Sequence, residues 1–355
     1  MKLLLGREDI NLNTPDPKSQ VTPLGQAAWA GNERVVELLL QREDINPDIP
    51  GAGCSIKPLL LAARRGHAGV VKLLLERKDI DPNTAETEYG RTPLLWAAVK
   101  GHSRVAELLL EREDIGSNAR DNKRGRTPLW WAADYGYEGI VKLLLKREDV
   151  NPNTADTEYN FTPLGRAAAK GYIGVVEPLL ERVDINPNTG DTKYGRTPLI
   201  LAVRQGYEGV VGLLLKREDV NPNTADTEYG GTPLWWAAQL GYVRIVKSLL
   251  ERKDLNPDIR GPTGQTALEV AASWKNAKVV KILSQLKHSH PLPRNPASKQ
   301  WERYRGSREL SRPGCGAWLR GAPPGMRACI VFVIISFIGL LAIILILRFF
   351  HPRGN

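Results

Sequence analysis

An internal period of 35 residues, shortened to 34 at its last step, is the feature that most constrains this chain. The tripeptide Thr-Pro-Leu begins at positions 22, 92, 127, 162, 197 and 232, with Lys-Pro-Leu at 57 and Thr-Ala-Leu at 266. Residues 143–159 and 213–229, two periods apart, are identical. A fixed period of this length predicts an array of one repeated supersecondary unit.

The residues of one unit predict two short helices and a polar turn. Thr127 and Pro128 suit the start of a helix, and Gly136 suits its end. A second, more apolar helix follows and stops before Pro152, because proline disfavours helix in the preceding residue. Two helices this short cannot bury their own apolar faces, so neighbouring units must stack. We therefore predict an all-α repeat solenoid of about eight units.

The repeated motifs resemble those of the ankyrin repeat. They read Thr-Pro-Leu-x-x-Ala-Ala-x-x-Gly-His/Tyr, then Val-Val-x-Leu-Leu-Leu, then Asp-Ile/Val-Asn, and they cover residues 1 to about 286. Two departures are a period of 35 rather than 33 residues and the absence of His after Thr-Pro-Leu. The resemblance implies helix-turn-helix units, each followed by a hairpin-like loop, and a concave face that binds partner proteins.

The chain divides into five predicted parts. These are a partial leading repeat (1–21), the repeat array (22–286), a basic linker rich in Pro and Gly (287–327), a hydrophobic segment (328–347) and a short tail (348–355). Of 49 Lys and Arg and 39 Asp and Glu residues, 11 and 2 lie from residue 287 onward, which leaves 38 against 37 before it. This nearly neutral body argues against nucleic-acid binding by the array.

The hydrophobic segment from Ala328 to Leu347 predicts a membrane anchor. It contains no charged residue, and as a helix it would span roughly 30 Å, the thickness of a bilayer's hydrocarbon core. Three arginines, at 312, 320 and 327, precede it and two follow it, which favours a cytosolic array. We therefore predict a single-pass, tail-anchored protein whose array faces the cytosol. The alternative for this segment is a buried core helix.

No sequence motif of catalysis or metal binding is present. HExxH, GxxxxGK[ST] and GxSxG are absent, and the three cysteines form no CxxC pair. His67 and His102 occupy the slot that holds tyrosine in other units, such as Tyr137 and Tyr172, which indicates a structural role. We expect a non-catalytic protein without cofactor or metal.

Positions at which the units differ are the candidates for function, because stacking alone explains the shared positions. The two residues before each helix-ending glycine differ in every unit, and the resemblance places this slot on the concave face. The alternative for these positions is neutral drift of exposed side chains, but Tyr and Arg are favoured anchors at interfaces. Together with tyrosines of the polar turn, the predicted protein-binding residues are Arg64, Arg65, Lys100, Asp134, Tyr135, Lys170, Arg204, Gln205, Gln239, Tyr89, Tyr159, Tyr194 and Tyr229.

Tryptophan and proline residues give two further expectations. Tryptophans recur in register at positions 96, 131 and 236, so we expect them to pack in the core. We expect the neighbouring Trp130 and Trp235 to be partly exposed. Pro178 replaces a leucine inside a predicted helix and removes a backbone hydrogen bond there. It predicts a kink or soft point in the fifth unit.

The sequence favours a scaffold or adaptor that holds an unknown protein partner near a membrane. The alternative is a fragment of a larger receptor, because nearly identical units of this form are similar to fungal arrays that often follow a nucleotide-binding NACHT module. Residues 2–10 align with 72–80, in the middle of a unit, so we expect an upstream segment to precede them.

Overall fold

The computed structural model describes residues 11–49, 56–261 and 263–289. These residues form sixteen helices and no strand, arranged as eight helix pairs. The first helices of the pairs are α2 (Pro23–Ala30), α4 (Pro58–Arg65), α6 (Pro93–Lys100), α8 (Pro128–Tyr135), α10 (Pro163–Lys170), α12 (Pro198–Gln205), α14 (Pro233–Leu240) and α16 (Ala267–Ser273). The second helices are α3 (Glu33–Leu40), α5 (Ala68–Leu75), α7 (Ser103–Leu110), α9 (Glu138–Leu145), α11 (Ile173–Glu181), α13 (Glu208–Leu215), α15 (Val243–Leu250) and α17 (Ala277–Ser289). The predicted all-α solenoid of eight units is confirmed.

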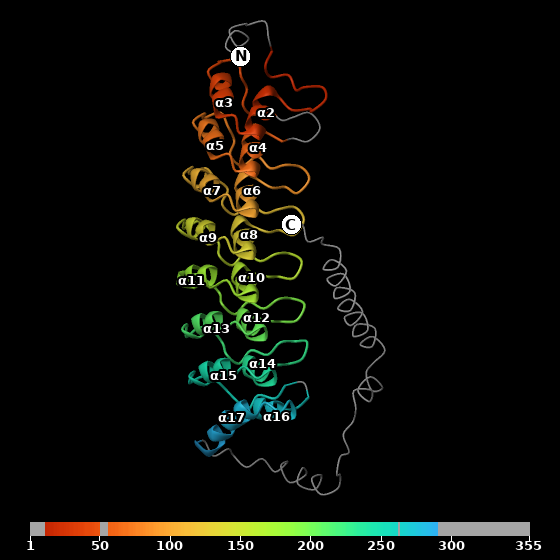
Figure 1. Ribbon diagram of the computed structural model, residues 1–355, viewed down its shortest axis with the longest axis vertical. Helices are drawn as coiled ribbons and strands as arrows, with labels where there is room; N and C mark the ends of the chain where they lie inside the picture. The colour runs from red at the N-terminus through yellow and green to blue at the C-terminus, as the bar shows by residue number, and fades with distance from the viewer. Residues whose placement is uncertain (1–10, 50–55, 262, 290–355) are drawn as a thin grey trace, which may run out of the picture. The chain divides into compact units, whose positions relative to one another are not determined.

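The helix pairs stack into two parallel rows. Figure 1 shows the first helices in one row and the second helices in another, with the loops projecting from the far side of the first-helix row. Each first helix packs against the first helices of the neighbouring units, and the second helices do the same. Apolar side chains from both rows form one continuous core along the array.

The boundaries of the first helices follow from their capping residues. The Thr127 hydroxyl accepts a hydrogen bond from the Trp130 amide at 3.2 Å, and Pro128 takes the first helical position. A threonine caps the first helix in this way in every unit but the second, where Lys57 makes no side-chain cap. Gly136 ends helix α8 with a left-handed φ of 74°, a backbone conformation that suits glycine.

From His67 to Tyr242, the aromatic residue after each helix-ending glycine contacts the glycine of the preceding unit. The Tyr172 ring lies against Gly136, so that a β-carbon on this glycine would lie 3.1 Å from the ring. His67 and His102 lie in the same way against glycines of the preceding units, and the His67 Nε2 atom is 3.1 Å from the Trp29 carbonyl oxygen. Their predicted structural role is confirmed.

The recurring Asn-Pro-Asn segment forms a hydrogen-bond ladder between units. The Asn153 side chain donates to the Asp184 carbonyl at 2.7 Å and accepts from the Asn186 amide at 2.7 Å. The same pair of bonds recurs at the corresponding asparagines 13, 83, 118, 188 and 223. In the second unit Asp48 takes the place of this asparagine, and its carboxylate cannot donate a hydrogen bond. Lys57 pairs with Asp48 and donates to the Thr84 hydroxyl of the next unit at 2.8 Å, which joins the two units instead.

The arginine of the Arg-x-Asp segment forms a second ladder. The Arg182 guanidinium holds the Asp184 carboxylate at 2.8 Å and also donates to the Leu145 and Arg147 carbonyls of the preceding unit. This hydrogen bond to Arg182 holds the pKa of Asp184 below its usual range. These repeated charges therefore hold neighbouring helix ends together.

The tryptophans are more deeply buried than the sequence predicts. Trp96, Trp131 and Trp236 are buried, which confirms the expected core position. The expectation that Trp130 and Trp235 are partly exposed is wrong, because they are only 1% and 4% exposed. The Trp130 indole donates to the Phe161 carbonyl of the next loop at 2.7 Å, so the neighbouring unit covers this side chain.

Pro178 lies inside helix α11 without ending it. The helix continues to Glu181 and has nine residues, one more than α9 or α13. Pro178 is buried, whereas Leu143 and Leu213 at the same slot are half-buried. The helix is not broken, so the expected soft point remains a prediction about stability.

Restoring leucine at this slot is expected to stabilise the fifth unit. Pro178→Leu returns the amide that can donate within α11, and we expect the free energy of unfolding to rise by about 1–3 kcal/mol. Urea denaturation measures the change, and amide hydrogen exchange in residues 173–181 should slow. Exchange in the native fifth unit that is no faster than in the fourth would contradict the soft point.

The predicted parts at the two ends of the chain are described only in part. Helix α17 runs to Ser289, so the linker predicted from residue 287 begins later than expected, because no proline interrupts the helix before Pro291. The rest of this linker, the segment from Ala328 to Leu347 and the tail lie outside the described residues, as do residues 1–10 of the leading repeat. Among the described residues no helix is long and apolar enough to cross a membrane.

Candidate functional site

The loops between units form a regular surface beside the first helices. An acidic residue closes each of the tight turns that begin at residues 86, 121, 156, 191 and 226. In one of them, the Asp156 amide donates to the Phe161 carbonyl at 3.0 Å, and the Asp156 carboxylate accepts from the Tyr159 amide at 2.8 Å. Neighbouring loops are also bonded to each other, as from the Thr192 amide to the Tyr159 carbonyl at 2.9 Å. We call this surface, made by the turns at 86–91, 121–126, 156–161, 191–196 and 226–231 and by the C-terminal ends of the first helices, the loop face.

Buried carboxylates fasten the turns to the tryptophans of the first helices. The Trp131 indole donates to Asp121 at 3.0 Å, and the Trp236 indole donates to Asp226 at 2.5 Å. This pairing was not predicted from the sequence, although acidic residues recur ten positions before these tryptophans. It fixes the position of the rings beneath the loop face.

Glu86 is the exception among these carboxylates. In this unit Glu replaces Asp, and both the Trp96 indole nitrogen and Glu86 Oε1 are buried without a hydrogen-bond partner. Burial raises the pKa of Glu86 above its usual range, and the neighbouring Glu88 carboxylate raises it further. The longer Glu86 side chain therefore does not accept the indole hydrogen bond that Asp121 accepts from Trp131.

Shortening Glu86 is therefore expected to restore the bond. We expect Glu86→Asp to raise the free energy of unfolding by about 1 kcal/mol, because two unpaired buried groups become partners. Denaturation of this variant beside Asp121→Glu, which is expected to show the opposite change, measures the effect. A loss of stability in Glu86→Asp would contradict this explanation.

The predicted binding residues are spread along the loop face, from α4 to α14, and do not form a single cluster. Exposed members are Arg65, Lys100, Tyr135, Tyr159, Gln205 and Tyr229. Half-buried members are Arg64, Tyr89, Lys170, Tyr194, Arg204 and Gln239. The exposed tyrosines at 135 and 229 show 44% and 43% of their surface, so they are well placed for contact with a partner.

Asp134 takes part in contacts within the array. It is 6% exposed, and its carboxylate accepts from Arg166 at 2.6 Å and pairs with Lys170 at 3.1 Å, both from the next unit. Arg204 likewise stacks on the Trp236 ring at 4.1 Å and lies 3.8 Å from Glu228. These side chains hold neighbouring units together and offer little free surface.

Cations stacked on aromatic rings are the feature of this face that sequence reasoning missed. The Arg65 guanidinium lies 3.6 Å from the centre of the Trp29 ring, and Arg91 lies 4.6 Å from that of Trp96. The signal was present, because a basic residue precedes Thr-Pro in several units. The missed cations are Arg91, Lys123, Arg126, Arg166, Lys193 and Arg196.

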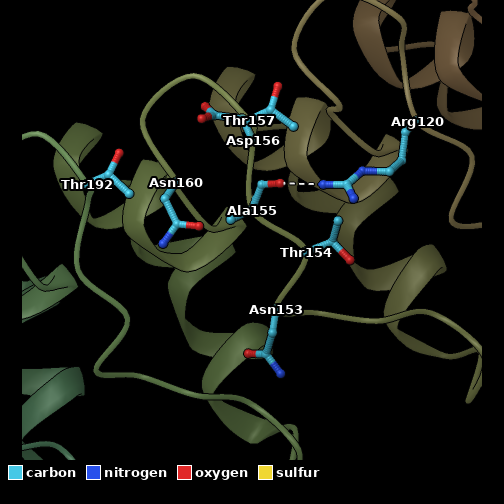
Figure 2. Close-up of a pocket in the computed structure, with 8 residues that line it drawn as sticks. All are labelled: Arg120, Asn153, Thr154, Ala155, Asp156, Thr157, Asn160 and Thr192. Carbon is cyan, nitrogen blue, oxygen red and sulfur yellow. Dashed lines mark hydrogen bonds between the residues drawn. The ribbon is translucent and has the colours of Figure 1, made fainter.

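A polar hollow of about 570 Å³ lies between two of the turns. Figure 2 shows its lining, in which Arg120 reaches across to donate to the Ala155 carbonyl at 2.7 Å. Arg120 also donates to the Gly125 carbonyl, so its guanidinium group is already hydrogen-bonded to two turns. Within the described ranges, no group of three or more His, Cys, Asp or Glu side chains could hold a metal ion.

Comparison with protein families supports the repeat pattern. A family model described as ankyrin repeats (3 copies) matches residues 46–121, 115–191, 155–226 and 219–292. A model of the single ankyrin repeat matches residues 20–52. The comparison with curated proteins found no match.

Proposed function

This chain belongs to the ankyrin-repeat family, and on that premise we propose that its array is a non-catalytic scaffold that binds a protein partner on the loop face. The observation that carries the proposal is the exposure of Tyr135, Tyr159 and Tyr229 on a surface that hydrogen bonds hold rigid. Exposed aromatic residues on a rigid support are favoured anchors for a partner. Stacking of the units does not require this exposure.

Affinity capture with the tagged full chain tests this proposal. The variant Tyr135→Ser, Tyr159→Ser, Tyr229→Ser should lose the proteins that the native chain retains. A matched variant, Ile173→Ser, Val183→Ser, removes two exposed apolar side chains, 49% and 95% exposed, from the second-helix side and should retain them. Equal capture by the two variants, with both folded by circular dichroism, would exclude the loop face as the binding surface.

We also propose that Ala328 to Leu347 anchors the array to the cytosolic face of a membrane. The proposal rests on the length and uncharged composition of this segment and on the arginines before it. Carbonate extraction and protease protection of the full chain, beside a chain ending at Gln285, test it. The full chain alone should resist extraction, and external protease should cleave its array. Extraction of both chains would reject the anchor.

The alternative function is recognition within a larger NACHT-type receptor. Nearly identical units, such as residues 143–159 and 213–229, are the observation that favours it. Sequencing of full-length transcripts tests this alternative. An in-frame upstream region encoding a P-loop would support the receptor, whereas a stop codon directly upstream would exclude it.

A further inference from the structure

The cations of the loop face differ in their partners along the array. From Arg124 onward the arginines of this face are matched by carboxylates: Arg124 lies 2.7 Å from Glu158, and Arg166 lies 2.5 Å from Asp134. Arg196 also pairs with Glu228. The arginines of this part are therefore neutralised by the array itself, whereas Lys193, near the Tyr159 and Tyr194 rings, has no carboxylate within 4.0 Å among the described residues.

From α4 to Lys123, the cations that face aromatic rings have no such partner among the described residues. We call Arg64, Arg65, Arg91, Lys100 and Lys123 the basic strip. Across the described residues, no carboxylate oxygen lies within 4.0 Å of their charged nitrogens, which instead face the rings of Trp29, Tyr89 and Trp96. The basic strip is a local excess of positive charge on a chain whose repeats are otherwise nearly neutral.

Three members of the basic strip converge on one ring. Arg64, Arg91 and Lys100 lie 4.5, 4.6 and 5.9 Å from the centre of the Trp96 ring. The carboxylates near them are Glu86, which is buried with a raised pKa, and Glu88. Like charges gathered around one ring repel each other, so an added anion near them would be stabilising.

Stacking leaves the arginines able to bind a carboxylate. A guanidinium whose flat face lies on a ring keeps its N–H donors in its own plane, where they can form paired bonds with a carboxylate. Neither Arg64 nor Arg65 makes a side-chain ion pair within the described part of the chain. The rings therefore fix the orientation of the cations before a ligand arrives.

We propose that the basic strip binds an acidic segment of a partner protein. Its carboxylates pair with Arg64, Arg65 and Arg91, and its apolar side chains contact Trp29, which is 39% exposed. The proposal rests on the proposed scaffold function and names the class of its partner. The C-terminal segment of this chain does not fit the strip, because it carries 11 basic and only 2 acidic residues from position 287 onward.

A polypeptide fits the strip better than a phosphate backbone does. Glu88 is exposed beside Tyr89, the ring that faces Arg91 and Lys123. It would repel a continuous row of phosphates, whereas the carboxylates of a peptide can be spaced on either side of it.

Binding of defined probes to the full chain tests the proposal. The probe is a fluorescein-labelled peptide of alternating Glu and Leu with one Tyr, and the comparison peptide has Lys in place of Glu. We expect only the Glu peptide to bind, with an affinity that falls as sodium chloride rises from about 50 to about 300 mM. Duplex DNA and vesicles containing phosphatidylserine serve as the other polyanions.

A pair of charge-matched variants locates the site. Arg64→Gln, Arg65→Gln, Lys100→Gln should weaken binding of the Glu peptide by about tenfold or more. The matched variant removes three exposed lysines from the second-helix side and should bind like the native chain: Lys72→Gln, Lys78→Gln, Lys146→Gln. Circular dichroism verifies that both variants are folded.

Three results would overturn the proposal. They are equal binding of the Glu and Lys peptides, equal losses in the two variants, and tighter binding of DNA or vesicles through the same three residues. The variant Tyr135→Ser, Tyr159→Ser, Tyr229→Ser leaves the basic strip intact. If protein capture depends on these tyrosines but the chain does not prefer the Glu peptide, only the acidic partner is rejected, and the scaffold function is not.

Discussion

Replacing Asp121 by alanine is expected to lower the free energy of unfolding by about 3–5 kcal/mol. This carboxylate is 5% exposed and accepts from the Trp131 indole at 3.0 Å and from the Arg124 amide at 2.9 Å. Its loss leaves a buried indole N–H and a turn amide without partners, and it also removes a negative charge near Arg126. One substitution therefore loosens both a turn of the loop face and the tryptophan beneath it.

Asp114→Ala is the matched comparison for this prediction. Its carboxylate also pairs with an arginine, Arg112 at 2.7 Å, but about half of its side chain is exposed, so we expect a change of about 1 kcal/mol or less. Urea denaturation followed by far-ultraviolet circular dichroism compares the two. Because repeat arrays can unfold unit by unit, hydrogen exchange in residues 121–135 should show the local loss. If the two variants lost the same free energy of unfolding, the prediction for the buried Asp121 carboxylate would be wrong.

The period of the sequence predicted the fold because each unit is built from local signals. Thr127, Pro128 and Gly136 set the start and end of a helix within one unit, and the structure places them there. What the local pattern could not show is how one unit covers another. Trp130 was expected to be partly exposed, and it is buried because its indole meets the Phe161 carbonyl of the next loop. That contact joins residues from different units.

The same limit applies to the predicted binding residues. Variation between units correctly drew attention to the slot that holds Tyr135, which is exposed. It did not separate Tyr135 from the adjacent Asp134, which is buried between Arg166 and Lys170 of the next unit. Whether a charged side chain meets solvent or a charge of opposite sign depends on distances that only the folded array defines.

Gly171→Ala is expected to lower the free energy of unfolding by about 2–4 kcal/mol. Gly171 has a φ of 76°, in the left-handed region that alanine adopts only with strain, and a β-carbon there would lie 2.9 Å from the Tyr207 ring. The next unit cannot move away without losing the contact that joins the two units. The substitution should therefore destabilise the junction between α10 and α12.

Gly212→Ala is the same chemical change, but we expect it to raise the free energy of unfolding. Gly212 lies inside helix α13, and apart from its chain neighbours and the helix's own backbone no described atom lies within 4 Å of the position that its β-carbon would take. Alanine is favoured over glycine within a helix, so we expect a gain of about 0.5–1 kcal/mol. Thermal and urea denaturation of both variants measure the contrast, and hydrogen exchange should accelerate near Tyr207 in Gly171→Ala alone. If both substitutions destabilised the chain equally, the loss would belong to added bulk in general and not to the Tyr207 ring that covers Gly171.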